Sequence, residues 1–170
     1  MGYAKMNCMG SKELSAESIA GLASALAIAV LSFLPWATFG SRSVTGIDLE
    51  STWFSHWLGM GDGEITFLLA CVSAVSILVA SYSLRPSMLP SIALAAGLMI
   101  SLMGVQTIVN GGGRPPVPPG VIEFLAPPRG DVTLAIYGVT ASGAILAGSA
   151  FWSVLQSWQA RPAVQSELTA

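Results

Sequence analysis

The side chains best suited to chemistry gather in the stretch between residues 48 and 64. The single histidine of the chain lies there among four acids: His56 with Asp48, Glu50, Asp62 and Glu64. Imidazole and carboxylate groups can together hold a metal ion or transfer protons. The five residues show no spacing typical of metal ligands, so we expect a structural or solvated role for His56. An integral-membrane enzyme that uses these groups is a third hypothesis, after the two given below.

The two cysteines do not predict a disulfide. Cys8 lies in the N-terminal tail and Cys71 lies within an apolar stretch, so we expect their thiols to be far apart. The sequence contains no Walker loop and no G-x-S-x-G, H-E-x-x-H or C-x-x-C-H motif. We therefore expect no catalytic residue, no metal and no cofactor, and we predict that the protein is not an enzyme.

The elements that must position these groups are apolar. Only 9% of the 170 residues are charged and 53% are hydrophobic, with a mean hydropathy of +0.69. Soluble domains have about 25% charged residues, and so few charges cannot cover the surface of a soluble fold. The net charge of −2 and the lack of a basic patch exclude nucleic acid as a partner.

Four uncharged stretches are long enough to cross a bilayer, for which about 20 apolar residues are needed. They cover residues 19–36, 65–84, 88–109 and 132–155. Backbone amides in lipid must pair within their own segment, so each stretch is expected to be a helix. The predicted fold class is an all-α membrane protein, a four-transmembrane-helix bundle. It forms a single integral membrane domain over residues 1–170, with two longer extracytoplasmic loops: 37–64 and 110–131.

Several residues fit the ends of these stretches. Ser15 and Asp62 precede the first and second, and Asp131 precedes the fourth, where each can cap a helix N-terminus. Pro90 lies in the first turn of the third, where its missing N–H costs little. In the first outer loop, the β-forming residues from Val44 to Leu49 predict a short strand. The alternative for the first stretch is a signal peptide with a cleavage site at residues 27–29.

Charge asymmetry sets the predicted orientation. One side of the membrane holds both termini and four basic residues, whereas the other side holds three. By the positive-inside rule both termini are cytoplasmic, in a multi-pass protein of the plasma (inner) membrane. Aromatic side chains near the span ends are expected in the headgroup layers: Trp36, Trp53 and Trp57 outside, and Tyr82, Trp152 and Trp158 inside.

Apolar residues in the two outer loops are the candidate partner or interface contacts: Trp53, Phe54, Trp57, Val121, Ile122, Phe124 and Leu125. The three in the first loop have the spacing of one apolar helix face, which can lie on the membrane surface or dock on a protein. The four in the second loop lie between proline-rich segments, which hold the chain extended. A flexible connection is the alternative for the second loop.

Small residues recur at four-residue spacing in three of the stretches. The rows are Gly21, Ala25 and Ala29; Ala93, Gly97 and Ser101; Gly138 and Ser142; and Ala144 and Gly148. Such rows let helix backbones approach closely in lipid, where the hydrophobic effect does not drive helices together. We expect them to pack the bundle itself. The alternative is that one row faces a partner subunit.

Three short motifs carry a resemblance: Leu34-Pro35-Trp36, Ser43-Val-Thr-Gly46 and Gly61-Asp-Gly63. With them the chain resembles small four-span membrane proteins of actinobacteria, most of which have no assigned function. It is loosely similar to claudin-type tetraspans, but it lacks their paired loop cysteines, so the resemblance does not imply claudin function. Some small actinobacterial membrane proteins are accessory subunits of larger assemblies such as respiratory supercomplexes.

The predicted function is a non-catalytic accessory or scaffolding subunit of a larger membrane protein complex, for example a respiratory assembly. Its expected partners are other integral membrane subunits and membrane lipid. The alternative is a small homo-oligomeric channel or lipid-handling transporter. In that case four hydroxyl side chains line a path between copies: Ser73, Ser76, Thr140 and Ser142.

Overall fold

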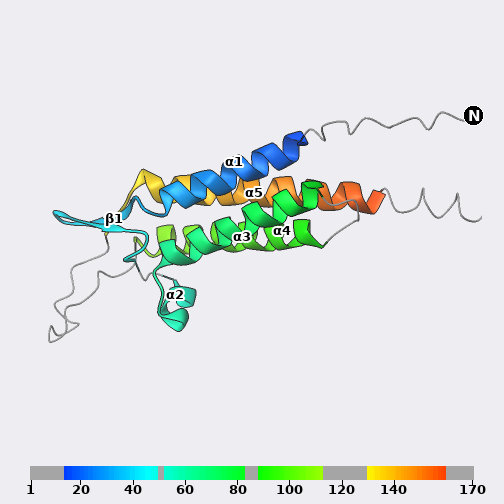
Figure 1. The fold of residues 1–170 in the computed structure, drawn as a ribbon. Helices are drawn as coiled ribbons and strands as arrows, with labels where there is room; N and C mark the ends of the chain where they lie inside the picture. Colours follow the sequence, from blue (N-terminus) through cyan, green and yellow to red (C-terminus); the bar gives the residue numbers. More distant parts are fainter. Residues whose placement is uncertain (1–13, 50–51, 83–87, 113–129, 160–170) are drawn as a thin grey trace, which may run out of the picture.

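The computed structural model describes residues 14–49, 52–82, 88–112 and 130–159. Its elements in chain order are α1 (Ala16–Leu31), β1 (Pro35–Phe39), β2 (Arg42–Thr45), α2 (Trp53–Leu58), α3 (Asp62–Tyr82), α4 (Leu89–Val109), β3 (Asp131–Val132) and α5 (Leu134–Gln159). The four long helices lie side by side (Figure 1). We call the end with the strands and α2 the sheet end, and the end where α1 begins and α5 finishes the terminal end.

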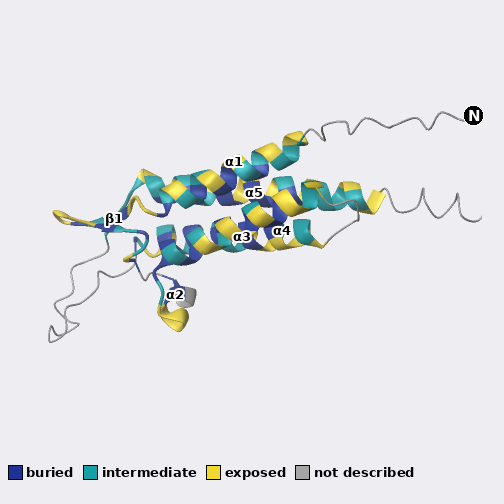
Figure 2. Cartoon of the chain, viewed as in Figure 1, coloured by how far each residue is buried: buried dark blue, intermediate teal, exposed yellow. Residues whose placement is uncertain are grey.

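The four long helices form a closed ring. Helices α1 and α4 each pack against both α3 and α5. Fully buried Ile28, Ile100 and Leu146 fill the centre of the bundle, and buried residues line the facing sides of the helices in Figure 2. The outward faces also carry large apolar side chains: Leu26 and Leu102 are more than half exposed. An outer surface with many apolar side chains suits lipid rather than water as the solvent.

Three of the described helices, α3, α4 and α5, are long and apolar enough to cross a membrane. At 1.5 Å per residue they reach about 31, 31 and 39 Å, and a bilayer core is about 30 Å thick. Helix α1 is apolar but has only 16 residues, or about 24 Å. The prediction of a mostly helical protein with apolar helices long enough to cross a membrane is confirmed for three of the described helices.

Two predicted helix boundaries agree with the structure. The Ser15 hydroxyl accepts a hydrogen bond from the backbone N–H of Ser18 at 3.3 Å, so Ser15 caps α1. Pro90 lies in the first turn of α4. The helix expected over residues 19–36, in contrast, ends at Leu31. Pro35 lacks an N–H and restricts the residue before it, so the chain turns and continues as a strand.

The sheet at the end of the bundle corrects the all-α prediction. Strand β1 is central and pairs antiparallel with β2 on one side and β3 on the other. The strand expected over Val44–Leu49 lies instead at Arg42–Thr45, because the two-residue turn at Gly40-Ser41 sets the hairpin. Asp131 pairs with Thr38 in the sheet and is not the cap of the last helix, which begins at Leu134.

Candidate interaction surface

The first connection folds back onto the bundle around a buried tryptophan. The Trp36 side chain is fully buried, and its Nε1–H donates to the carbonyl of Leu31 at 2.9 Å, at the end of α1. A Cβ atom on Gly46 would lie 2.5 Å from the Trp36 ring, so only glycine fits against it. The prediction that Trp36 anchors the chain in the headgroup layer is therefore wrong: Trp36 belongs to the core.

Glycine also allows this connection to touch the start of α3. The Gly63 N–H donates to the carbonyl of Gly46 at 2.6 Å, and a Cβ on Gly63 would lie 2.4 Å from the Gly46 carbonyl carbon. Below this contact, the buried hydroxyls of Ser32 and Thr66 are 2.9 Å apart and link the end of α1 to α3. The base of the sheet end is thus fixed by close backbone contacts and by buried hydrogen bonds.

Short helix α2 is attached to this base by a buried carboxylate. The Thr52 hydroxyl accepts from the Ser55 N–H at 3.3 Å, which caps α2, and donates to Asp62 Oδ1 at 2.6 Å. Asp62 is fully buried at the first position of α3, and its N–H donates to the Leu49 carbonyl at 2.7 Å. Gly59 ends α2 with a positive φ of 64°. Helix α2 is therefore held at a defined place beside α3 (Figure 1).

Helix α2 presents its outer side to the surroundings. Trp57 is 72% exposed and Leu58 is 46% exposed, and His56 next to them is also exposed. Trp53 and Phe54 are part of the same helix, but their side chains lie outside the described residues. The second predicted segment also lies outside the described residues: Val121, Ile122, Phe124 and Leu125.

The acids around His56 have local roles. Asp62 is bound to Thr52, Asp48 accepts from the Thr45 hydroxyl at 2.7 Å, and Glu64 accepts from the Gly61 N–H at 3.3 Å. In the part of the chain that the structure describes, no three histidine, cysteine or acidic side chains are grouped to hold a metal ion. Glu50 lies outside that part.

The small-residue rows divide between the inside and the outside of the bundle. A Cβ on Gly97 would lie 2.7 Å from the Ala147 nitrogen and 2.9 Å from the Gly143 oxygen, so this row packs α4 against α5. Gly21 lies against Ile77 of α3. In contrast, Ala144 and Gly148 are exposed on α5, and no atom lies within 4 Å of a Cβ built on Gly148.

The spacing of small residues did not identify the row of α5 that faces the interior of the bundle. Gly143 and Ala147 are buried against α4. They have the same four-residue spacing as the exposed pair Ala144 and Gly148, which lies one position later in the chain. The spacing alone cannot tell the two rows apart. One signal was present on α4. Gly104 lies seven residues after Gly97, so both glycines lie on one side of α4, and this pair indicates that a neighbouring helix approaches that side closely.

Three of the four hydroxyl groups considered for a path between copies bond within their own helices. Ser73, Ser76 and Thr140 donate to the carbonyls four residues earlier, at 2.7 to 2.8 Å. Ser73 and Ser76 are buried inside the bundle, whereas Thr140 and Ser142 are half-buried. Serine and threonine in membrane helices commonly satisfy their protons in this way, without a pathway.

The chain matches no protein-family model, no curated protein and no solved structure. A proposal for its function must therefore be argued from its own sequence and structure. The fold and the two outward surfaces, α2 and the exposed row of α5, are therefore the basis for a functional proposal.

Proposed function

We propose that the protein is a non-catalytic accessory or scaffolding subunit of a larger integral membrane complex. In this proposal α1, α3, α4 and α5 all span the plasma membrane, the sheet end lies outside, and both termini lie in the cytoplasm. The partner is another integral membrane subunit that contacts α2 outside the bilayer and the exposed face of α5 within it.

The observation that carries this proposal is the way α2 is held. A six-residue helix cannot persist by itself, because helix formation needs a longer segment or tertiary contacts. Here a buried bond between Thr52 and Asp62 fixes it while Trp57 stays largely exposed. A large aromatic residue on a rigid support is the usual centre of a protein interface. Anchoring of α2 in the headgroup layer would also use Trp57, so the experiment must distinguish partner binding from membrane anchoring.

The exposed row on α5 supports a partner at membrane depth. Ala144 and Gly148 are exposed on α5, and Phe151 and Trp152 are both about half exposed one turn further along. Small residues at this spacing let a second helix approach closely in lipid. The rows that contain Gly21 and Gly97 pack inside the bundle, whereas this row is available to another subunit.

The test is the recovery of partners with the tagged full-length chain from its native membrane in mild detergent, followed by mass spectrometry. Trp57→Ala should lower the amount of recovered partner by about thirtyfold, because central aromatic contacts often contribute about 2 kcal/mol. Trp158→Ala, at an equally exposed tryptophan of the terminal end, is the matched control and should leave recovery unchanged.

Recovery of the chain alone, under conditions that keep other membrane complexes intact, would contradict the proposal. Equal losses with both tryptophan variants would instead indicate general anchoring in the headgroup layer, since both side chains are exposed.

One observation favours the alternative of a lipid-handling protein. A groove of about 540 Å³ runs between α3 and α4, with almost entirely apolar walls that include Leu69, Val72 and Met99. Its shape and chemistry suit an acyl chain. Reconstituted liposomes that move fluorescent lipid faster than empty ones, together with a native mass of two or more copies, would favour this alternative over the subunit.

A further inference from the structure

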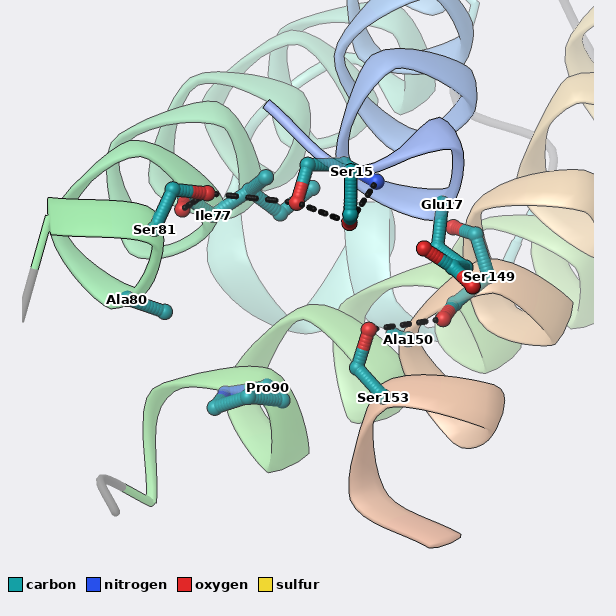
Figure 3. Close-up of a pocket in the computed structure, with 10 residues that line it drawn as sticks. Ser15, Glu17, Ile77, Ala80, Ser81, Pro90, Ser149, Ala150 and Ser153 are labelled. Atoms are coloured by element: carbon teal, nitrogen blue, oxygen red, sulfur yellow. Dashed lines mark hydrogen bonds between the residues drawn. The ribbon is translucent and has the colours of Figure 1, made fainter. Parts of the chain in front are cut away.

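A cavity with serine and glutamate side chains in its wall lies among all four long helices at the terminal end, away from α2. Its volume is about 320 Å³, and Figure 3 shows the side chains that surround it. Six of its ten described lining residues are polar: Ser15, Glu17, Ser18, Ser81, Ser149 and Ser153. The remaining residues are small or apolar, among them Ile77, Ala80 and Ala150. We call it the terminal cavity. A polar site between membrane helices needs an explanation beyond packing.

The hydroxyls around the terminal cavity already have hydrogen-bond partners within the chain: Ser15 and Ser18 lie 3.1 Å apart, and Ser81 lies 3.2 Å from Ser18. Ser81 donates to the Ile77 carbonyl at 2.8 Å, Ser149 to the Leu146 carbonyl at 2.9 Å, and Ser153 to the Ser149 carbonyl at 3.1 Å. A serine hydroxyl has one proton and two lone pairs. Each of these side chains therefore has lone pairs left to accept hydrogen bonds, and the cavity needs a ligand that donates.

The first turn of α1 offers few N–H donors that could occupy these serine lone pairs in place of a ligand. The Ser18 N–H donates to the Ser15 hydroxyl, and the Ile19 N–H donates to the Ser15 carbonyl at 3.0 Å. Glu17 bonds to its own backbone N–H and accepts from Gln156 Nε2 at 3.2 Å. These bonds hold the pKa of Glu17 below its ordinary value, so its carboxylate is charged at neutral pH. The cavity wall contains no lysine or arginine among the described residues.

We propose that the terminal cavity binds a primary ammonium group on a short carbon chain, from either a free amine or a lipid headgroup. The three N–H protons of the ammonium meet the Glu17 carboxylate and the serine lone pairs. Its carbon atoms meet the side chains of Ile77, Ala80 and Ala150. An anion would face a carboxylate, and a bare metal ion would leave most of the volume unfilled. The position among the helix ends is the depth at which lipid headgroups lie.

The free-amine arm of the test titrates the full-length protein in detergent with ethanolamine and follows tryptophan fluorescence. Choline at the same ionic strength is the comparison, because its nitrogen has no proton to donate. Glu17→Gln should weaken ethanolamine binding about tenfold and Ser153→Ala about threefold. Asp131→Asn removes an exposed carboxylate at the sheet end and should leave binding within about twofold.

The lipid arm uses native mass spectrometry of the protein from nanodiscs that contain equal phosphatidylethanolamine and phosphatidylcholine. Preferential retention of phosphatidylethanolamine that Glu17→Gln abolishes, without a response to free ethanolamine, assigns the site to the headgroup. A response to ethanolamine without lipid preference assigns it to a free amine. Binding of choline or phosphatidylcholine as strongly as their primary-amine counterparts overturns the proposal. So does the absence of both responses, or equal effects of Glu17→Gln and Asp131→Asn.

Discussion

Gly97 and Gly148 are chemically identical but have opposite surroundings. Gly97 on α4 touches the backbone of α5 at Gly143 and Ala147, whereas Gly148 on α5 faces open space. A backbone atom cannot move aside as a flexible side chain can, so an added methyl group at Gly97 must separate the two helices. The same methyl group at Gly148 meets nothing within the chain.

We expect Gly97→Ala to lower the free energy of unfolding in detergent by about 1–3 kcal/mol, the usual effect of overpacking. Gly148→Ala should change it by no more than about 0.5 kcal/mol, or raise it slightly, because alanine favours the helix. Thermal or denaturant unfolding of both variants, followed by circular dichroism, measures the difference. Equal stabilities would show that α4 and α5 do not approach as closely as described.

Gly148→Ala has a second use at this scale. If a partner helix packs on the exposed row of α5, the variant lowers partner recovery while leaving the isolated chain stable. Loss of recovery together with loss of stability would show that Gly148 is needed within the chain itself.

Glu17 provides a pH-dependent effect on stability. Its hydrogen bonds, first to its own N–H and then to Ser15, lower its pKa in the folded state. The folded state then binds this proton less readily than the unfolded state does. The stabilisation is therefore complete above the unfolded pKa and is lost as the pH falls through the folded pKa. The melting temperature of the parent chain should fall towards that of Glu17→Gln across this acidic range, and a constant difference would contradict the assignment.

Trp36 shows why some residues cannot be placed from sequence. A tryptophan after a long apolar stretch is typical of the headgroup layer, and Trp152 and Trp158 are indeed exposed near the other end. What places Trp36 in the core is Gly46, ten residues later, whose missing side chain makes room for the indole. That contact depends on the path of the chain between them, which no local pattern records.

At the scale of elements, a buried side-chain contact between Thr52 and Asp62 helps to hold α2 in position. Thr52 satisfies both the cap of α2 and one oxygen of the buried Asp62 carboxylate. Thr52→Val keeps the volume but removes both interactions. We expect it to lower the free energy of unfolding by about 1–3 kcal/mol, because a buried carboxyl oxygen loses its donor. Hydrogen exchange in α2 should become faster.

The matched control is Thr45→Val. Thr45 donates to Asp48 at 2.7 Å, but Asp48 is exposed, so water can replace the lost bond. The expected change is within about 0.5 kcal/mol. Similar losses for the two variants would mean that burial of Asp62 does not determine how α2 is held.

The elements divide into those with local signals and those without. The positions of Ser15 and Pro90 predict helix starts correctly, because caps and first-turn prolines act within one turn. The sheet was mostly missed, because β3 has two residues and gains its structure only by pairing with β1. Asp131 illustrates the failure: next to an apolar stretch it is typical of a cap, yet distant pairing places it in a strand.

At the scale of the molecule, the ring of four helices predicts opposite locations for its two ends. We expect Ser41→Cys, in the hairpin of the sheet end, to react with a membrane-impermeant maleimide from outside intact cells. Gln159→Cys, at the end of α5, should react only after the membrane is opened. Both tests use a chain without Cys8 and Cys71. Labelling of both sites from one side would contradict four membrane crossings.

The pairing of β1 with β3 has a consequence for biogenesis. Ala37 lies opposite Val132, about 95 residues further along the chain. At a synthesis rate of about 5–20 residues per second, several seconds pass between the emergence of these two strands. During that interval the hairpin of β1 and β2 has an uncovered strand edge, which chaperones or neighbouring chains can pair with. Strand β3, the last to emerge, thus pairs with the edge of β1 that is left unpaired. A chain released from a ribosome that stalls before residue 131 therefore keeps an unpaired strand edge, which can pair with other chains.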